Sequence, residues 1–469
     1  MSNYEFDRDI YKFLAQWKED CARRKIALEV RGARQIGKTH SIQKFINENF
    51  RKVYELNMFV DDERAHVEEV RQNRSRPRDP LGIVSALFPD FEDASDAVLF
   101  FDEVQESSFL YNLIRPINRE LKCQLILSGS FLGHTLNRNF VTPTGDIMTK
   151  NMYSLSFPEF LGAVGERSLY EQADLLGGSD SGVYERLKKA FLMYLQIGGH
   201  PKVVEEVLDK KDIDFVRGEI EKLINTFYNE SKRYFDDILD ITRLRTLMVA
   251  MANLLLRDKR GSLNVSYELE KIMNNSTRQS ILKSLSWFYE SGIIEPCDRV
   301  NDCDWSNITP TCRYYFSDIG VANYFYRQVP LQTENIYGEL CESFAYSCLR
   351  DMGGPIQKTP HFATHGDDEL DYMFSVRSGG KIVSVGIEVK GGKSAGNSAM
   401  RLLEKGKINY LVNAKLDTRG GRTGNIFTIP LTLLGRFNIF DYIPDDDEIE
   451  RQRTQEFLTN GEFNYKPQF

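Results

Sequence analysis

A glycine-rich loop at residues 32–39, GARQIGKT, constrains the fold of this chain more than any other feature. The run KIALEVR before it is typical of a strand, and the apolar spacing of HSIQKFI after it predicts a helix. Two glycines let such a loop point successive backbone N–H groups, together with the helix amino terminus, at a bound anion. The pattern GxxxxGK[ST] between a strand and a helix therefore predicts a phosphate-binding loop in an α/β fold.

Two later apolar runs predict further strands of the same parallel sheet. AVLFF at residues 97–101 is followed by Asp102 and Glu103, and CQLIL at residues 123–127 is followed by Ser128 and, after a glycine, Ser130. These polar residues stand at the carboxyl ends of their strands, the edge where open α/β sheets bind ligands. Either strand alone would be interpreted as an ordinary core strand. In this order after the loop, they indicate a nucleoside triphosphate hydrolase.

The residue types suggest separate roles at this site. Lys38 is expected to reach the β- and γ-phosphates, while Thr39 and Asp102 hold Mg²⁺, Asp102 through water. Glu103 is the expected catalytic residue that orients or deprotonates the attacking water, and the Ser130 hydroxyl is expected to sense the γ-phosphate. No NKxD tetrapeptide, which would read guanine, occurs in the chain, and this favours ATP. The residues expected to contact the nucleotide are Gly32, Ala33, Arg34, Gln35, Ile36, Gly37, Lys38, Thr39, His40 and Ser130.

Five segments together resemble the successive motifs of AAA-type ATPases that are widespread in bacteria and archaea, whose carboxyl half is a domain long labelled as of unknown function. They are RGARQIGKTHSI (31–42), LFFDEVQE (99–106), LILSGSFL (125–132), YSLSFPEFL (153–161) and YLQIGGHPKVV (194–204). The resemblance implies an ATP-binding core in residues 1 to about 200, with the lysine, threonine and two acids named above in the family's functional places.

The chain departs from this family at one position. Family members usually carry a Gly-Arg pair shortly before the LSF element, and this chain has Gly145 and Asp146 there. If that arginine acts on phosphate, its role is lost here or has moved, for instance to Arg115 or Arg138.

The middle of the chain predicts a winged helix-turn-helix. YELEKIM at 267–273 and residues 278–289 have helical character, NNST at 274–277 is a turn with a cap, and GIIEP at 292–296 begins β structure. The second helix would be the one to enter a DNA groove. Its basic residues are Arg278 and Lys283 alone, and Trp287 and Phe288 are core-like, so a spacer that packs between other domains is the alternative.

The carboxyl region predicts a helix followed by a β-hairpin. Glu342 lies at the inward edge of an apolar helical stripe, in a segment that continues the family resemblance. Alternation in residues 368–376 places Asp371 on one strand face, with Leu370 and Tyr372 on the other. The next strand, residues 381–390, places its Glu-x-Lys motif on one face, and Gly386 on that face would leave room for a metal.

Helix Glu, strand Asp and Glu-x-Lys resemble the active-site pattern of the PD-(D/E)XK nuclease superfamily. Glu342, Asp371 and Glu388 would coordinate Mg²⁺, and Lys390 would assist the nucleophile or neutralise the transition state. ExK triplets are common, however, and many nuclease-like domains have lost activity. Cleavage of nucleic acid and binding without cleavage both remain open.

The net charge of −8 and the pI of about 5.5 argue against a protein that binds nucleic acid over its whole surface. A local excess of basic residues after the last strand could still face a phosphate backbone. No apolar run of about 18 residues occurs, and the first 25 residues mix both charge signs, so we expect a cytoplasmic protein without membrane contact. The basic residues are Lys390, Lys393, Arg401, Lys405, Lys407, Lys415, Arg419, Arg422 and Arg436.

The sequence thus predicts an α/β chain of three domains: an AAA-like ATPase at residues 1–204, a winged-helix segment at 205–330 and a nuclease-like α/β domain at 331–469. The expected function is Mg²⁺-dependent ATP hydrolysis that controls binding or cleavage of DNA or RNA. The alternative is an ATP-driven switch or scaffold whose nuclease-like domain binds a partner without cutting. Assembly into an oligomer is compatible with both.

Overall fold

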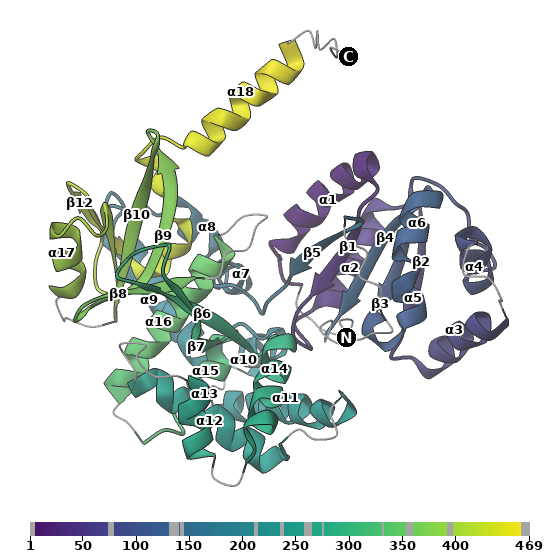
Figure 1. Cartoon of the computed structure of the whole chain (residues 1–469), viewed down its shortest axis with the longest axis horizontal. Coiled ribbons are helices and arrows are strands. Elements are labelled where there is room, and N and C mark those ends of the chain that lie inside the picture. The colour runs from purple at the N-terminus through teal and green to yellow at the C-terminus, as the bar shows by residue number, and fades with distance from the viewer. Residues whose placement is uncertain are drawn as a thin grey trace.

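The computed structural model folds the chain around two β-sheets that lie on opposite sides of the molecule (Figure 1). The N-terminal sheet is at the right of Figure 1, and a larger sheet is at the left, above a group of helices. The structure describes residues 5–73, 79–130, 140, 145–210, 214–234, 239–257, 265–273, 276–330, 333–352, 360–391 and 397–460. None of the helices in these ranges has both the length and the apolar character needed to cross a membrane.

Five parallel strands form the N-terminal sheet in the order β2-β3-β4-β1-β5. Strands β3 and β4 are buried along their whole length, as expected when helices cover both faces of a parallel sheet. The parallel α/β sheet expected from the sequence is therefore confirmed. The strands are β1 (Ala27–Arg31), β2 (Lys52–Asn57), β3 (Ala97–Asp102), β4 (Gln124–Gly129) and β5 (Ile147–Asn151).

Successive side chains of these strands enter two separate cores. Val30 and Phe100 pack on the face covered by α1 and α2, while Leu99 and Phe101 pack on the opposite face against α3 to α6. Because helices cover both faces of the sheet, a ligand can bind at the carboxyl edge of the strands. The helices are α1 (Ile10–Arg24), α2 (Lys38–Asn49), α3 (Asp61–Asn73), α4 (Pro80–Leu87), the 3₁₀ turn η1 (Val104–Glu106), α5 (Ser108–Asn112) and α6 (Ile114–Glu120).

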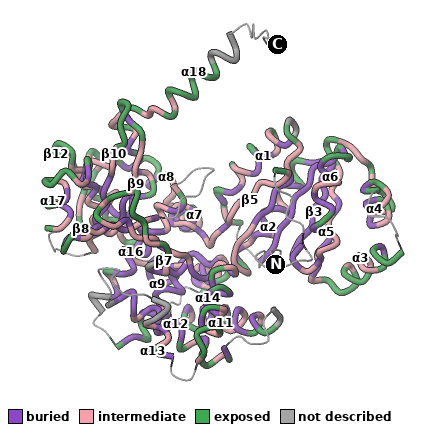
Figure 2. Tube along the Cα trace, in the orientation of Figure 1, coloured by how far each residue is buried: buried purple, intermediate pink, exposed green. Residues whose placement is uncertain are grey.

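Most of the helices in the rest of the chain share one hydrophobic core with the larger sheet, a core that extends from Leu155 to Ile439, while the helix at residues 397–404 packs in a smaller core on the same sheet. In Figure 2 the strands of the N-terminal sheet are mostly buried, those of the larger sheet mix buried and partly exposed residues, and the projecting helix α18 is mostly exposed. These helices are α7 (Phe157–Ala163), α8 (Arg167–Gln172), α9 (Ser181–Ile197), α10 (Pro201–Lys210), α11 (Asp214–Tyr234), α12 (Ile241–Arg257), α13 (Val265–Ile272), α14 (Arg278–Glu290), α15 (Ile319–Tyr326), α16 (Thr333–Asp351), α17 (Asn397–Glu404), η3 (Leu431–Arg436), η4 (Ile439–Asp441) and α18 (Asp446–Asn460).

Eight strands form the larger sheet, in the order β12-β13-β11-β10-β9-β8-β6-β7. The hairpin β6–β7 follows α14, where the sequence predicts the wing, and β6 pairs in parallel with β8. The sheet therefore contains strands from both sides of the predicted domain boundary between residues 330 and 331. The division into two domains there stays a prediction. The strands are β6 (Ile294–Asn301), β7 (Ile308–Phe316), β8 (His361–His365), β9 (Asp368–Ser378), β10 (Lys381–Lys390), β11 (Tyr410–Lys415), β12 (Gly421–Thr423) and β13 (Ile426–Pro430).

Candidate nucleotide site and carboxyl-region acidic cluster

The glycine-rich loop leaves β1 and enters α2 at Lys38. A side chain at Gly32 would place its Cβ 2.1 Å from the backbone oxygen of Met152, so the close approach of these two segments requires glycine. Gly37 precedes the helix with φ 92°, a left-handed conformation that glycine adopts readily. Gln35 is exposed with φ 60°, and His40 is exposed on the first turn of α2. The loop thus has the strand-to-helix setting that the sequence predicts.

Lys38 is buried within this loop. Its Nζ donates hydrogen bonds to the carbonyl oxygens of Gly32 at 2.9 Å and Ala33 at 2.8 Å, and to Ser130 Oγ at 3.3 Å. Burial lowers the pKa of Lys38 below its ordinary value, although Glu103 and then Asp102 oppose this effect. The ammonium is therefore held where an anion above the loop would meet it.

Asp102 and Thr39 contact each other directly. Thr39 Oγ1 donates to Asp102 Oδ2 at 2.8 Å, and Asn57 Nδ2 donates to the same oxygen at 3.1 Å. Ser128 Oγ donates to the other oxygen, Oδ1. Burial raises the pKa of Asp102 above its ordinary value. The hydroxyl and the carboxylate lie close enough to bind one Mg²⁺ ion together, and oxygen ligands of this kind suit that hard cation.

Glu103 begins the turn after β3 with φ 52°. Its Oε1 accepts from Ser130 Oγ at 2.7 Å, and its Oε2 accepts from Ser130 N–H at 3.2 Å and Gln105 Nε2 at 2.6 Å. Burial alone would raise the pKa of Glu103, but Lys38 and these hydrogen bonds outweigh it, so the pKa is lowered. Glu103 is thus held ionised beside Lys38. Asn57, Gln105 and Ser128 were not predicted as site residues, although Asn57 also stands at the carboxyl end of a strand.

Of the two alternative arginines, Arg115 is among the described residues and pairs with an acid. Arg115 Nε donates to Asp146 Oδ2 at 2.7 Å, so the acid that replaces the family's arginine pairs with the expected substitute. Arg138 lies outside the described residues.

Residues from the later segments cover one side of the loop. Arg34 Nε lies 2.6 Å from Glu230 Oε2 of α11, and a Cβ at Gly292 would lie 3.1 Å from the backbone nitrogen of Ala33. A cavity of about 240 Å³ opens between the N-terminal sheet and these segments, with Gly32, Ala33, Ser130, His200 and Asp318 among its lining residues. The nucleotide site is therefore in contact with the part of the chain that follows it.

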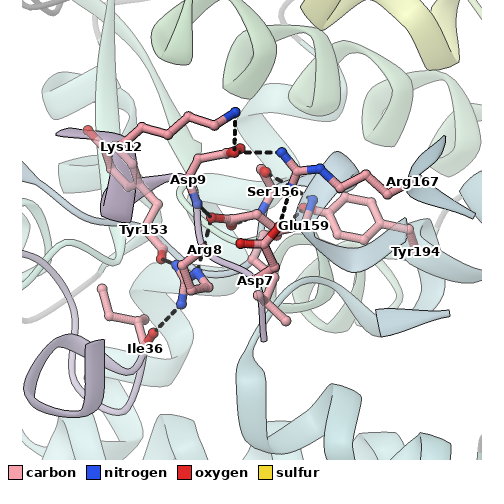
Figure 3. Close-up of polar contacts among 11 residues, drawn as sticks. Asp7, Arg8, Asp9, Lys12, Ile36, Tyr153, Ser156, Glu159, Arg167 and Tyr194 are labelled. Carbon is pink, nitrogen blue, oxygen red and sulfur yellow. Dashed lines mark hydrogen bonds and ion pairs between the residues drawn. The ribbon is translucent and has the colours of Figure 1, made fainter. Parts of the chain in front are cut away.

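Arg8 connects the loop to the LSFPEFL segment (Figure 3). Its guanidinium donates to the Ile36 carbonyl at 2.8 Å, to the Tyr153 carbonyl at 2.7 Å and to Glu159 Oε1 at 3.1 Å. Glu159 Oε2 also accepts from the backbone N–H of Ser156 at 2.8 Å, which completes a capping box at the start of α7. The sequence carries no local signal for Arg8, because its partners lie far along the chain.

The carboxyl acids and Lys390 gather around the hairpin β9–β10. Lys390 Nζ lies 2.5 Å from Glu388 Oε1, and Asp371 Oδ2 accepts from Val389 N–H at 2.6 Å. Burial, and then repulsion from Glu388 and Glu342, raises the pKa of Asp371 well above its ordinary value. Burial also raises the pKa of Glu388, while Lys390 opposes it. Burial alone would lower the pKa of Lys390, but Asp371 and Glu388 outweigh it, so the pKa is raised.

Glu342 has other partners. Its Oε1 accepts from Tyr315 Oη at 2.7 Å and from Arg313 Nη1 at 3.4 Å, and Arg313 Nη2 donates to Glu369 Oε1 at 2.6 Å. Within the described ranges, no group of three or more His, Cys, Asp or Glu residues is arranged to hold a metal ion. In this conformation Glu342, Asp371 and Glu388 therefore do not form a ready metal site.

Two expectations about the hairpin β9–β10 were wrong, one about the faces of β9 and one about the space beside Gly386. Ala363 pairs with Leu370 but His361 pairs with Met373, so β9 has one extra residue opposite β8. This β-bulge puts Leu370 and Tyr372 into different cores instead of on one face. Gly386 leaves no room for a metal, because a Cβ there would lie 2.7 Å from Ile408 Cδ1.

Several of the basic residues expected to form a surface after β10 are engaged by other groups of the protein. Arg401 and Lys405 both pair with Asp368, and Arg436 donates to two backbone carbonyls, those of Tyr170 and Ala173. Lys393 lies outside the described residues.

Comparison with known families matches two separate segments of the chain. Residues 24–161 match the model of the AAA domain. All five strands of the N-terminal sheet lie within this match to an AAA domain. Residues 188–332 match a second model, the domain of unknown function DUF8612. No curated protein matches the chain. The AAA match contains the loop, Asp102, Glu103 and Ser130, while Arg8 precedes it and Glu230 follows it.

Several solved structures are similar to the chain at low sequence identity. The *Aeropyrum pernix* Orc1 protein in complex with DNA is 15% identical, with 69% of this chain and 93% of that chain covered and a TM-score of 0.31. The *Thermotoga maritima* RuvB Holliday junction branch migration motor is 14% identical, with 62% and 90% covered and a TM-score of 0.27. Cdc6p from *Pyrobaculum aerophilum* is 12% identical, with 70% and 96% covered and a TM-score of 0.28. At these scores the likenesses carry no argument about function.

Proposed function

We propose that this chain binds and hydrolyses ATP with Mg²⁺. The observation that carries the proposal is the meeting of Lys38, the Thr39–Asp102 pair and the Glu103–Ser130 pair at the carboxyl edge of β1, β3 and β4. Lys38 would exchange its loop carbonyls for phosphate oxygens. Thr39 and Asp102 would hold Mg²⁺, which neutralises charge on the phosphates.

Glu103 is the residue that we propose acts on water. Its lowered pKa keeps it ionised near neutral pH, so it can orient a water molecule and accept a proton from it. Ser130 contacts both Glu103 and Lys38, so it is placed to register whether a γ-phosphate is present.

Two substitutions test this proposal. Lys38→Ala should abolish both ATP binding, measured by calorimetry, and phosphate release. Glu103→Gln should keep ATP binding within a few-fold and reduce the rate of hydrolysis by about 10²- to 10⁴-fold, the usual contribution of a general base. Undiminished hydrolysis by purified Lys38→Ala protein would show that the site is wrong.

A second proposed function concerns the carboxyl region, which would bind nucleic acid, DNA or RNA, and cleave it with Mg²⁺. It is supported by the grouping of Asp371, Glu388 and Lys390 beside α16. The pairing of Glu342 with Arg313 and Tyr315 instead favours the alternative, a switch or scaffold that binds its partner without cutting.

Cleavage assays separate these alternatives. Branched, single-stranded and duplex substrates would be incubated with Mg²⁺ or Mn²⁺, with and without ATP. Cleavage that is lost in the double variant Asp371→Asn with Lys390→Ala supports the nuclease. Salt-sensitive binding without cleavage supports the scaffold. Cleavage that persists in the double variant points to another site or to contamination.

A further inference from the structure

Arg34 projects from the phosphate loop toward α11. Its Nε lies 2.6 Å from Glu230 Oε2, and its guanidinium stacks over the ring of Phe59 with 4.2 Å between the Cζ atom and the ring centroid. The two charged side chains are 18% and 13% exposed, so the pair is largely shielded from solvent. Stacking on an aromatic ring fixes the plane of a guanidinium.

The position of Arg34 in the loop brings its charge close to the catalytic groups. It directly follows Gly32 and Ala33, whose carbonyl oxygens hold the Lys38 ammonium. The charge of Arg34 is also felt at both Lys38 and Glu103, since it contributes to lowering the pKa of each. A phosphate between the ammonium and the catalytic carboxylate would therefore be attracted by the positive charge of this guanidinium.

Arg34 also has unused capacity to donate hydrogen bonds. Its Nη2 atom is buried and has no hydrogen-bond partner among the residues that the structure describes. A buried donor left unpaired is unfavourable, and a ligand oxygen that accepts from it would remove that cost. Other arginines near the loop have well-formed partners: Arg8 donates to two carbonyls and Glu159, Arg31 to Glu29, and Arg115 to Asp146.

We propose that Arg34 contacts the γ-phosphate from within its own loop and stabilises the charge of the transition state, and that Glu230 holds Arg34 while the site is empty. The inference rests on the proposed ATPase activity. In the reaction a water oxygen bonds to the γ-phosphorus and its proton passes to Glu103, while the bond to the β–γ bridging oxygen breaks and leaves ADP. Arg34 exchanges no proton; it supplies positive charge opposite the developing negative charge.

This role has a consequence for the rest of the chain. Glu230 belongs to α11, which lies in the region matched by the domain of unknown function. When Arg34 pairs with a γ-phosphate, Glu230 loses its ion pair with Arg34. The contacts of α11 therefore depend on whether the site holds ATP. A single ion pair thus joins catalysis to the segment that follows the AAA domain.

The test compares Arg34→Ala and Arg34→Lys with the wild-type chain. We expect Arg34→Ala to lower kcat by about 10³-fold or more, the range of arginines that act on phosphoryl transfer, while KM for ATP changes only a few-fold. ADP with aluminium fluoride, which mimics the transition state, should lose its affinity for Arg34→Ala although ADP alone still binds. Arg34→Lys should recover part of kcat, because a cation without the planar fork remains.

Glu230→Gln tests the other half of the pair. Without its carboxylate partner, Arg34 is available to the phosphate, so ATP should bind several-fold more tightly while ADP affinity stays unchanged. Arg64→Ala is the matched control, since it removes an exposed arginine of the neighbouring helix α3 that pairs with Asp61. It should keep wild-type kcat, and thermal unfolding should show that each variant is folded.

The outcomes separate this inference from the proposed activity. A wild-type chain that hydrolyses ATP, together with Arg34→Ala that keeps wild-type kcat and aluminium fluoride binding, overturns the role of Arg34 alone. A wild-type chain that binds no ATP overturns the proposed function and this inference with it. ATP affinity unchanged in Glu230→Gln overturns the part played by Glu230.

Discussion

Gly32 shows how much of the nucleotide site depends on one residue. Its missing side chain lets the loop approach Met152 to a distance that a Cβ could not tolerate. We expect Gly32→Ala to prevent ATP binding and to lower the free energy of unfolding by about 1–3 kcal/mol, the usual cost of forcing a methyl group into a packed site. Calorimetric titration and urea denaturation would measure the two effects.

The control for this change is Gly218→Ala in α11. That glycine is in a helix, with open space where a Cβ would lie. The substitution should stabilise the chain by about 0.5–1 kcal/mol, because alanine favours the helix. Equal behaviour of the two variants would contradict the steric role of Gly32.

The sequence predicted the residues of this site that lie in one local pattern. The loop residues and the acids after β3 are adjacent in the chain or end a recognisable strand, so their types and spacing suffice. Asn57, Gln105 and Arg8 reach the site from separate elements. Their positions depend on how those elements pack, and no short-range pattern reports that.

Buried His200, which lines the cavity between the N-terminal sheet and the later segments, should make stability depend on pH. Burial lowers the pKa of His200; Asp318 opposes this, and Lys202 and Arg8 add to it. The unfolded chain then takes up this proton near pH 6.5, before the folded chain does, so stability should fall as the pH drops below about 6.5. His200→Gln should lose less stability between pH 7 and pH 5 in urea titrations.

The exposed residue His40 provides the control for that measurement. His40→Gln should leave the pH dependence as it is in the wild-type chain. A His200→Gln variant that loses as much stability in acid as the wild type would show that His200 does not carry the effect.

Strand β9 shows why strand faces could not all be predicted from alternation. A period of two assumes regular pairing, and one extra residue between Leu370 and Met373 reverses the faces beyond it. The sequence predicted the Glu-x-Lys strand and the hairpin correctly. It could not predict that Arg313, from β7 at the edge of the sheet, would contact Glu342.

The ion pairs of Arg313 give a prediction about how elements are held together. Arg313 is 5% exposed and pairs with Glu342 of α16 and Glu369 of β9. Arg313→Met leaves both carboxylates without this cation in a mostly buried setting, and should lower the free energy of unfolding by about 3–5 kcal/mol. Arg377→Met, which breaks exposed pairs to Asp447 and Glu450, should leave the free energy of unfolding almost unchanged in the same urea titration, because solvent screens such pairs. Similar losses in both variants would contradict the structural role of Arg313.

Across the whole molecule, the sequence predicted the parallel sheet but not the joining of β6 to β8. The first follows from local runs in a familiar order. The second pairs segments more than 60 residues apart, and nothing in either run specifies the partner.

The same long-range packing creates a path from the phosphate loop to α16: Arg8 bridges the carbonyls of Ile36 and Tyr153, and Arg350 lies 3.4 Å from the centroid of the Tyr153 ring.

This path predicts that ATP binding will protect α16 from hydrogen exchange. The test uses the Glu103→Gln chain, in which bound ATP should persist. Tyr153→Leu removes the ring under Arg350 but keeps the backbone carbonyl that Arg8 contacts, so protection of the loop should remain while protection of α16 is lost. Tyr442→Leu, which removes another ring near an arginine, Arg422, should leave both effects intact. Protection of α16 that survives Tyr153→Leu would mean that the two regions communicate by another route, for which the contact between Arg34 and Glu230 is the nearest alternative.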